Sequence, residues 1–163
     1  MNISPKKSDR NMKVLLILFV FLSCPTVCLY SQDKTIKGRV IAEDLGIVPF
    51  ASIMIYDSVE IGKTDINGFF QIQIPISLNK LLFIFIGMEP TEISLPDTCD
   101  EVEVVMMLSG IYDFKTLRKV DRIRMKRFKN LPELHREAFS KGLFKTDRAC
   151  FTQMFIPSYK RRK

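Results

Sequence analysis

The sequence predicts an all-β fold, an antiparallel sandwich of seven strands, followed by a short basic α-helical extension at the C-terminus. Two observations support this prediction. Between residues 33 and 110, short runs of apolar and polar residues recur about every ten residues and are separated by turn-forming residues, a pattern typical of two-sheet β proteins. After residue 110, apolar residues recur at helical spacing among many basic ones. The length of 163 residues suits one domain with a tail.

The seven predicted strands follow one another without an intervening helix. In most of them apolar residues alternate with polar ones, so each strand has one buried face. The run at 81–86 is apolar throughout, which predicts a central strand covered on both faces. The run at 101–108 alternates again, with Glu101 and Glu103 on its polar side. The predicted strands cover residues 35–42, 48–56, 58–63, 69–75, 81–86, 91–95 and 101–108.

The clearest turn lies between the third and fourth predicted strands, at residues 64–68. Asp65 can accept backbone N–H groups across this turn, and Asn67 and Gly68 tolerate a positive φ. Asp65, Asn67 and the nearby Asp57 also offer oxygen atoms to a calcium ion. Calcium takes about six or more oxygen ligands, however, and this turn supplies too few. We therefore interpret Asp65, Asn67 and Gly68 as a structural turn.

Residues 1–31 have the features of a secretory signal peptide. Basic residues precede a run of about nine apolar residues, 14–22, in the usual order of a signal sequence. A run of that length is shorter than the ~20 apolar residues needed to span a bilayer. The prediction is cleavage before Gln32; an uncleaved anchor and a lipoprotein modified at Cys24 are the alternatives. The chain is therefore predicted to be exported.

Removal of residues 1–31 would leave Cys99 and Cys150 as the cysteines of the mature chain. An oxidising compartment would permit a disulfide between them, which would close a long loop and join the sandwich to the tail. Two remaining cysteines are weak evidence for a disulfide, however, and the sequence favours the simpler interpretation of two separate thiols.

Charge is distributed unevenly along the chain, whose net charge is +7. Residues 33–111 carry 5 basic and 12 acidic side chains, a net charge of −7, whereas residues 112–163 carry 16 basic and 5 acidic ones, a net charge of +11. Apolar residues at helical spacing from residue 111 predict an amphipathic basic helix, and Pro132 and Gly142 mark the start and end of a second helix. The candidate surface-binding residues of the first helix are Arg118, Lys119, Arg122, Arg124, Lys126, Arg127 and Lys129.

Several partners suit this basic helix. Anionic lipid or lipopolysaccharide would attract it electrostatically. It could instead pack on the acidic sandwich of its own chain, or contact an unidentified protein. Nucleic acid is not expected, because an exported protein does not meet it. The acidic residues of the sandwich are interpreted as a solvated edge that could also dock the tail; they are Asp97, Asp100, Glu101 and Glu103.

The sequence predicts no catalytic residue, no cofactor and no metal. A catalytic zinc takes three protein ligands, commonly two histidines and a carboxylate, and the chain has one histidine, His135. We interpret His135 as a helix-surface residue. There is no glycine-rich phosphate-binding motif, and nothing around Cys99 or Cys150 marks an activated thiol. The protein is therefore predicted not to be an enzyme.

Four blocks of residues occur in order within residues 36–87: Ile36-Lys37-Gly38-Arg39-Val40, Val48-Pro49-Phe50-Ala51, Gly62-Lys63-Thr64-Asp65-Ile66-Asn67-Gly68-Phe69-Phe70 and Leu82-Phe83-Ile84-Phe85-Ile86-Gly87. In this order and spacing they resemble the carboxypeptidase regulatory-like domain. Met88 departs from the family pattern, which usually has an aromatic residue after Gly87. The basic tail, with residues 131–139, looks like an extension seen in stand-alone exported members from Gram-negative bacteria.

This resemblance implies an Ig-like or prealbumin-like sandwich in the periplasm or at the outer membrane, acting as an accessory module and not as a peptidase. The expected organisation is a signal peptide at 1–31, the sandwich at 33–110 and the basic helical tail at 111–163. The expected function is a non-enzymatic binding module of the cell envelope, whose partner would be an envelope protein or a glycan. The alternative is an envelope-surface binder that uses its basic tail on anionic lipid or lipopolysaccharide.

Overall fold

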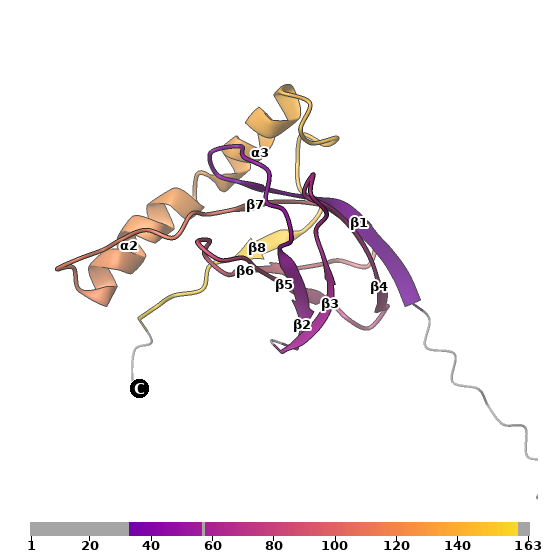
Figure 1. The fold of residues 1–163 in the computed structure, drawn as a ribbon, viewed down its shortest axis with the longest axis horizontal. Helices are drawn as coiled ribbons and strands as arrows, with labels where there is room; N and C mark the ends of the chain where they lie inside the picture. Colours follow the sequence, from indigo (N-terminus) through magenta and orange to yellow (C-terminus); the bar gives the residue numbers. More distant parts are fainter. Residues whose placement is uncertain (1–32, 57, 160–163) are drawn as a thin grey trace, which may run out of the picture. The chain divides into compact units, whose positions relative to one another are not determined.

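The computed structural model describes residues 33–56 and 58–159, which belong to one compact unit (Figure 1). The predicted signal peptide at 1–31 and Asp57 lie outside the described residues. Among the described residues, no helix is both long and apolar enough to cross a bilayer. The elements are β1 (Asp33–Ala42), β2 (Ser52–Ile55), β3 (Val59–Lys63), β4 (Phe69–Pro75), β5 (Lys80–Ile84), β6 (Thr91–Ser94), β7 (Glu101–Met106), α2 (Leu117–Phe128), α3 (Leu131–Ser140) and β8 (Thr152–Met154).

The strands form two sheets, one with the order β4-β1-β7 and one with the order β3-β2-β5-β6-β8. Neighbouring strands are antiparallel except β1 and β7, which run parallel with Gly38 opposite Val102. The predicted seven-stranded antiparallel arrangement is therefore wrong in two respects: residues 33–56 and 58–159 form eight strands, and one sheet is mixed. Side chains alternate with a period of two whichever way a strand runs, so the sequence pattern did not indicate the parallel pair.

All seven predicted strands are present, and the structure adds β8 from the tail. The second predicted strand is shorter than expected, because Phe50 has a φ of 57° and the strand starts two residues later, at Ser52. With three residues, β8 is too short to show an alternating pattern. It pairs with β6 and forms an edge of the five-stranded sheet.

The main core lies between the two sheets. Alternate residues of β1 and β7, such as Ile36, Val40 and Val104, are fully buried in it. The rings of Phe70 and Phe83 meet edge to face across it, with their centroids 5.6 Å apart. One hydrophobic layer thus joins the two sheets, as two-sheet packing requires.

A second, smaller core lies on the outer face of the three-stranded sheet. There Ile41, Val105 and Met107 pack against residues of the tail, including Leu131 and Ala138 of α3. Figure 1 shows α3 beside β1 and β7, on the side away from the five-stranded sheet. The tail therefore forms a third layer, which covers the outer face of β7 along most of its length and the end of β1.

The predicted double covering of residues 81–86 is wrong. Leu81 and Phe83 are buried, but Ile84 is 37% exposed and Ile86 is 94% exposed. The apolar run indicated a central strand correctly, since β5 lies in the middle of its sheet. No layer of the described chain covers the outer side of this strand, because the tail packs on the other sheet.

The two helices of the tail match the prediction in number but not at the start of the first. The predicted helix begins near residue 111, whereas α2 begins at Leu117. Phe114 has a φ of 58°, which lies outside the right-handed helical region. The second helix, α3, has Pro132 in its first turn and ends before Gly142, whose φ is 71°.

The turn at 64–68 has the hydrogen bonds that its sequence predicts. The Asp65 Oδ1 accepts N–H bonds from Asn67 and Phe69, each at 2.8 Å. Gly68 has a φ of 77°, and a Cβ there would lie 2.6 Å from the Val40 carbonyl oxygen. Glycine is therefore favoured at 68 for two reasons: the backbone is left-handed there, and it lies too close to β1 to leave room for a side chain.

Candidate functional site

Two of the seven candidate surface-binding residues bind groups of their own chain, and Arg124 is the clearer case. Its side chain is 6% exposed and forms ion pairs with Glu89 at 2.7 Å and Asp121 at 3.0 Å. It also donates a hydrogen bond to the hydroxyl of Ser158 at 2.7 Å. The prediction that Arg124 binds an external surface is therefore wrong, because its charge is used inside the protein.

Arg127, whose side chain is 27% exposed, is the second arginine that binds its own chain. It pairs with Glu43 of the sandwich and donates hydrogen bonds to the Tyr112 hydroxyl at 2.9 Å and the Leu108 carbonyl at 2.6 Å. The hydrogen bonds that Arg127 donates to the Glu43 carboxylate raise the pKa of its guanidinium above its ordinary value. Together, Arg124 and Arg127 attach α2 to acidic residues of the sandwich, so part of the basic helix does dock on its own chain.

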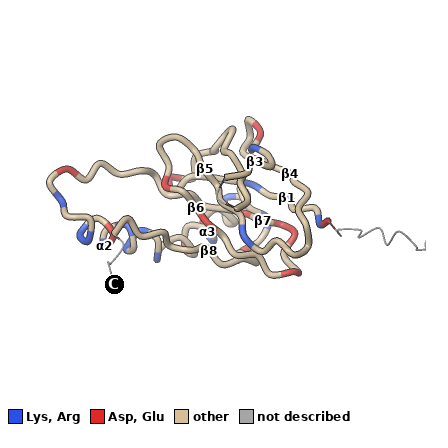
Figure 2. Tube along the Cα trace, turned by 90° about the horizontal axis from the view of Figure 1, so that it is seen from below, with Lys and Arg blue, Asp and Glu red and all other residues tan. Residues whose placement is uncertain are grey.

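Of the other five candidates, four lie on the outer face of α2 and the fifth, Lys129, directly follows the helix. Among the described residues none of them forms an ion pair, although the Arg118 guanidinium lies 5.5 Å from the centroid of the Tyr159 ring. Figure 2 shows Lys and Arg gathered along this helix. The five exposed residues are Arg118, Lys119, Arg122, Lys126 and Lys129.

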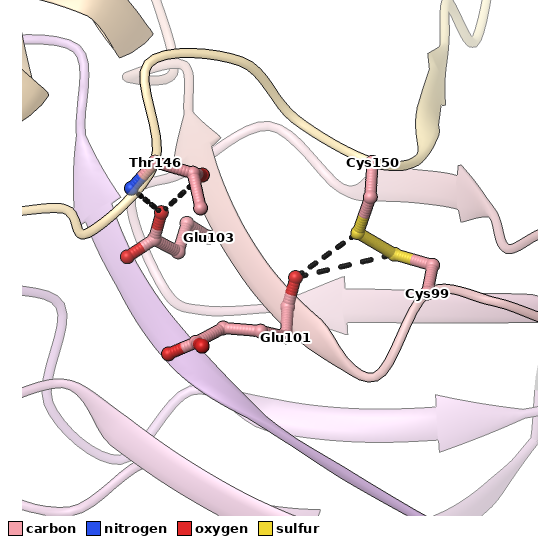
Figure 3. The surroundings of a disulfide bond; sticks show 5 residues. All are labelled: Cys99, Glu101, Glu103, Thr146 and Cys150. Carbon is pink, nitrogen blue, oxygen red and sulfur yellow. Dashed lines mark hydrogen bonds between the residues drawn. A yellow bond between two sulfur atoms is a disulfide. The ribbon is translucent and has the colours of Figure 1, made fainter.

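Acidic residues of β7 bind the segment that follows α3 (Figure 3). Glu103 is 3% exposed and accepts N–H bonds from Lys145 at 2.6 Å and Thr146 at 3.1 Å, together with the Thr146 hydroxyl at 2.8 Å. Glu101 forms an ion pair with the Lys145 ammonium at 2.5 Å. Glu103 is thus not part of a solvated edge. The hydrogen bonds from the tail replace those that water would donate to its carboxylate, which allows the carboxylate to be buried.

A disulfide joins Cys99 to Cys150, with Cα atoms 5.5 Å apart. The interpretation of two separate thiols is therefore wrong. Figure 3 shows both sulfur atoms beside the Glu101 carbonyl oxygen, which lies 3.1 Å from the Cys150 Sγ. A disulfide sulfur carries no hydrogen, so we regard this approach as a contact. The bond joins the residues just before β7 to those just before β8, and so fixes the C-terminal tail covalently to the sandwich.

A cleft of about 570 Å³ lies between α3, β7 and β8. Its volume falls in the range of ~300–1,000 Å³ that is common for small-molecule sites. Its apolar wall includes Val105, Phe128, Leu131, Ala149 and Phe151. Its polar lining is made of Glu103, His135, Arg136, Asp147, Arg148, Thr152 and Gln153, with Pro132 beside them.

His135 is one wall of this cleft and is 5% exposed, so the prediction of a helix-surface residue is wrong. Its Nε2 lies 3.2 Å from the Thr146 carbonyl oxygen, and its ring lies 4.7 Å from that of Phe144. Burial lowers the pKa of His135, and this effect outweighs the opposing attraction of Glu103. The ring is therefore neutral near pH 7 and donates Nε2–H to the carbonyl.

The rim of the cleft carries two arginines. Arg136 pairs with Glu133 one helical turn away, and Arg148 lies 3.8 Å from its neighbour Asp147. All four side chains are more than half exposed, and exposed pairs of this kind contribute about 0–1 kcal/mol. Either guanidinium could therefore exchange its partner for an anion. Among the described residues no group of three His, Cys, Asp or Glu side chains is placed to hold a metal ion.

The buried His135 predicts a pH dependence of stability. Its folded-state pKa lies below the ~6.5 expected when unfolded, so the unfolded chain takes up a proton that the folded chain does not. Stability should be unaffected by this group above pH ~6.5 and should fall below it, by at most about 1.4 kcal/mol per pH unit. Urea unfolding at about pH 7 and about pH 5 measures this loss. In His135→Gln the loss should be smaller, and an identical loss in both proteins would contradict the assignment.

Comparisons with known proteins give little beyond this geometry. No family model matches the chain, and no curated protein matches it. Among solved structures, the chain is similar to the "Crystal structure of the C-terminal domain of the PapC usher". That similarity has 17% sequence identity and a TM-score of 0.33, and covers 47% of this chain and 100% of that one. Similarity at this level does not establish a shared function.

Sequence reasoning missed the cleft entirely. Its lining residues come from 103–153, and three separate elements must meet before it exists. The two arginines that bind the sandwich, Arg124 and Arg127, could have been identified from their spacing in the sequence. Arg124 follows Val120 by four residues and Arg127 follows it by seven, which places both on the buried stripe of the helix.

Proposed function

We propose that this protein is a non-enzymatic binding module of the cell envelope, and that the cleft between α3, β7 and β8 is its binding site. The cleft itself is the observation that supports this function, because it combines an apolar wall with polar groups at its rim. The Cys99–Cys150 disulfide supports export, since structural disulfides persist in oxidising compartments. The fold is consistent with the carboxypeptidase regulatory-like resemblance, which remains part of the proposal.

The lining of the cleft favours one class of ligand, a small amphiphile with an apolar body and an anionic end. Val105, Leu131 and Phe151 offer an apolar surface that suits an acyl chain better than the hydroxyl groups of a glycan. Arg136 and Arg148 at the rim would receive the negative charge. The buried Glu103 is already satisfied by Lys145 and Thr146, so it does not compete for these arginines.

Titration calorimetry with three decyl compounds tests this proposal. Decanoate, decyltrimethylammonium and decyl maltoside share one tail and differ in their head groups. We expect saturable binding of decanoate with a negative heat-capacity change, and binding of the cationic compound at least ~10-fold weaker. Arg148→Gln should reduce this preference while leaving the fold intact, because Arg148 is exposed.

Ala149→Trp, compared with Ser140→Trp, tests whether decanoate binds in the cleft. Residue 149 is exposed and lines the cleft, so an indole there should fill it and weaken decanoate binding by ~10-fold or more. Ser140→Trp adds the same ring at an exposed position outside the cleft and should leave binding unchanged. Equal affinity in both variants, or no saturable binding of any decyl compound, would exclude the cleft as the site.

A further inference from the structure

The segment before α2 exposes large apolar side chains. Ile111 is 86% exposed, Phe114 fully exposed and Leu117 55% exposed. Phe114 also has a φ of 58°, a conformation that costs free energy for an aromatic residue. Burial within this chain does not account for these residues, because the hydrophobic clusters of the described residues do not include them.

Another exposed apolar residue lies near Ser109, where the segment that leads into α2 begins. The Ser109 N–H donates to the Gly87 carbonyl at 2.8 Å, and Met88 pairs with Leu108. These bonds hold Ile86, which is 94% exposed, beside the start of the 109–116 segment. We name the exposed apolar residues of the segment that leads into α2 the apolar tip; they are Ile111, Phe114 and Leu117.

Cations follow Phe114 along the chain, whereas one carboxylate, Asp113, lies directly before it. Lys115 follows Phe114 directly, and Arg118 and Lys119 occupy the first turn of α2, which has no acidic residue. Cations at a helix N-terminus are unfavourable because the helix dipole is positive there. No ion pair within the described residues offsets them. Exposed apolar side chains beside unpaired cations are the composition of protein surfaces that bind at a bilayer interface.

We propose that the apolar tip and its cations attach this protein to the interface of an anionic phospholipid bilayer. Phe114 and Ile111 enter the headgroup region, while Lys115, Arg118 and Lys119 bind lipid phosphates. A bilayer interface accommodates both groups at once, since it offers negative charge directly above an apolar layer. This attachment is independent of ligand binding in the cleft, so Ala149→Trp leaves it unchanged.

Vesicle co-sedimentation of the full chain measures this attachment. Vesicles of phosphatidylcholine with about 30% phosphatidylglycerol are compared with vesicles of phosphatidylcholine alone. Every variant is produced and purified in the same way, so that the N-terminal segment is the same in all. We expect stronger binding to the anionic vesicles, which weakens at high salt. Phe114→Ser should reduce it by ~10-fold or more.

Two matched controls locate the attachment. Phe50→Ser removes a Phe that is 60% exposed and also has a positive φ, 57°, in the loop before β2. It should leave vesicle binding unchanged. For charge, the triple variant Lys115→Gln, Arg118→Gln, Lys119→Gln should bind at least ~10-fold more weakly than Lys63→Gln, Lys80→Gln, Lys141→Gln, which lowers the net charge equally.

Four outcomes would overturn the proposal. They are equal binding to both kinds of vesicle, equal loss in Phe114→Ser and Phe50→Ser, equal loss in the two charge variants, and binding to lipopolysaccharide without binding to phosphatidylglycerol. Circular dichroism of Phe114→Ser checks that the fold is retained, and Phe114→Leu, which keeps an apolar side chain, should restore most of the binding. Failure of vesicle binding leaves the decanoate titrations unaffected, so the two proposals are tested separately.

Discussion

Replacing Arg124 with methionine is expected to destabilise the protein by about 3–5 kcal/mol. The guanidinium faces two carboxylates, Glu89 and Asp121, and its removal leaves both without their cation in a largely buried site. Burial alone would raise the pKa of Asp121, but N–H bonds from Tyr159 and Ser158, together with Arg124, lower it. Methionine preserves much of the packing beside Phe155, so the loss reports chiefly on the charge.

Arg122→Met is the control for this effect. Arg122 lies two residues away in the same helix and is exposed, without an ion pair among the described residues. Its replacement should change the free energy of unfolding by less than about 0.5 kcal/mol. Chemical unfolding followed by circular dichroism measures both variants. If the two variants were equally stable, Arg124 would be a surface cation after all.

Gly38→Ala is expected to have the other large effect, a loss of more than about 4 kcal/mol or failure to fold. Gly38 lies in β1, the central strand of its sheet, opposite Val102 of β7. A Cβ at this position would lie 1.7 Å from the Val102 carbonyl oxygen, far closer than atoms can approach. The contact is with backbone, so β1 and β7 would have to separate and open both cores.

Gly87→Ala provides the comparison. Gly87 has a φ of 82°, which disfavours alanine, but a Cβ there meets nothing within 4 Å. Its replacement should cost only about 1 kcal/mol, the penalty for the backbone conformation. Yield of folded protein and thermal unfolding distinguish the two variants. A Gly38→Ala protein as stable as Gly87→Ala would show that β7 does not lie beside Gly38.

Local patterns in the sequence predicted the local structure well. The alternation of apolar residues located seven strands, the turn at Asp65 and Gly68 was confirmed, and Pro132 and Gly142 mark the ends of α3. These features depend on neighbouring residues, which the sequence displays directly. The parallel pairing of β1 with β7 depends on how distant segments meet, and a strand's alternation is the same in either direction.

The candidate site was harder to predict for the same physical reason. A basic helix predicts a binding surface, but the cations of α2 have two different roles. Arg124 and Arg127 bind the sandwich, whereas the other four in the helix face outward. Spacing from Val120 separates the two groups, whereas residue type does not. Glu103 was misassigned because its partners are backbone N–H groups at 145 and 146, which have no signature in the sequence.

Strand β8 bears on the solubility of the protein. It covers the outer edge of β6, where Thr91 and Ile93 are buried. A chain cut after the recognisable sandwich, near residue 110, would leave the backbone N–H and C=O groups of β6 unpaired and open to strands of other molecules. The last strand of the tail therefore protects the sandwich against edge-to-edge aggregation. The shorter module that the sequence suggests would be a poor choice for expression by itself.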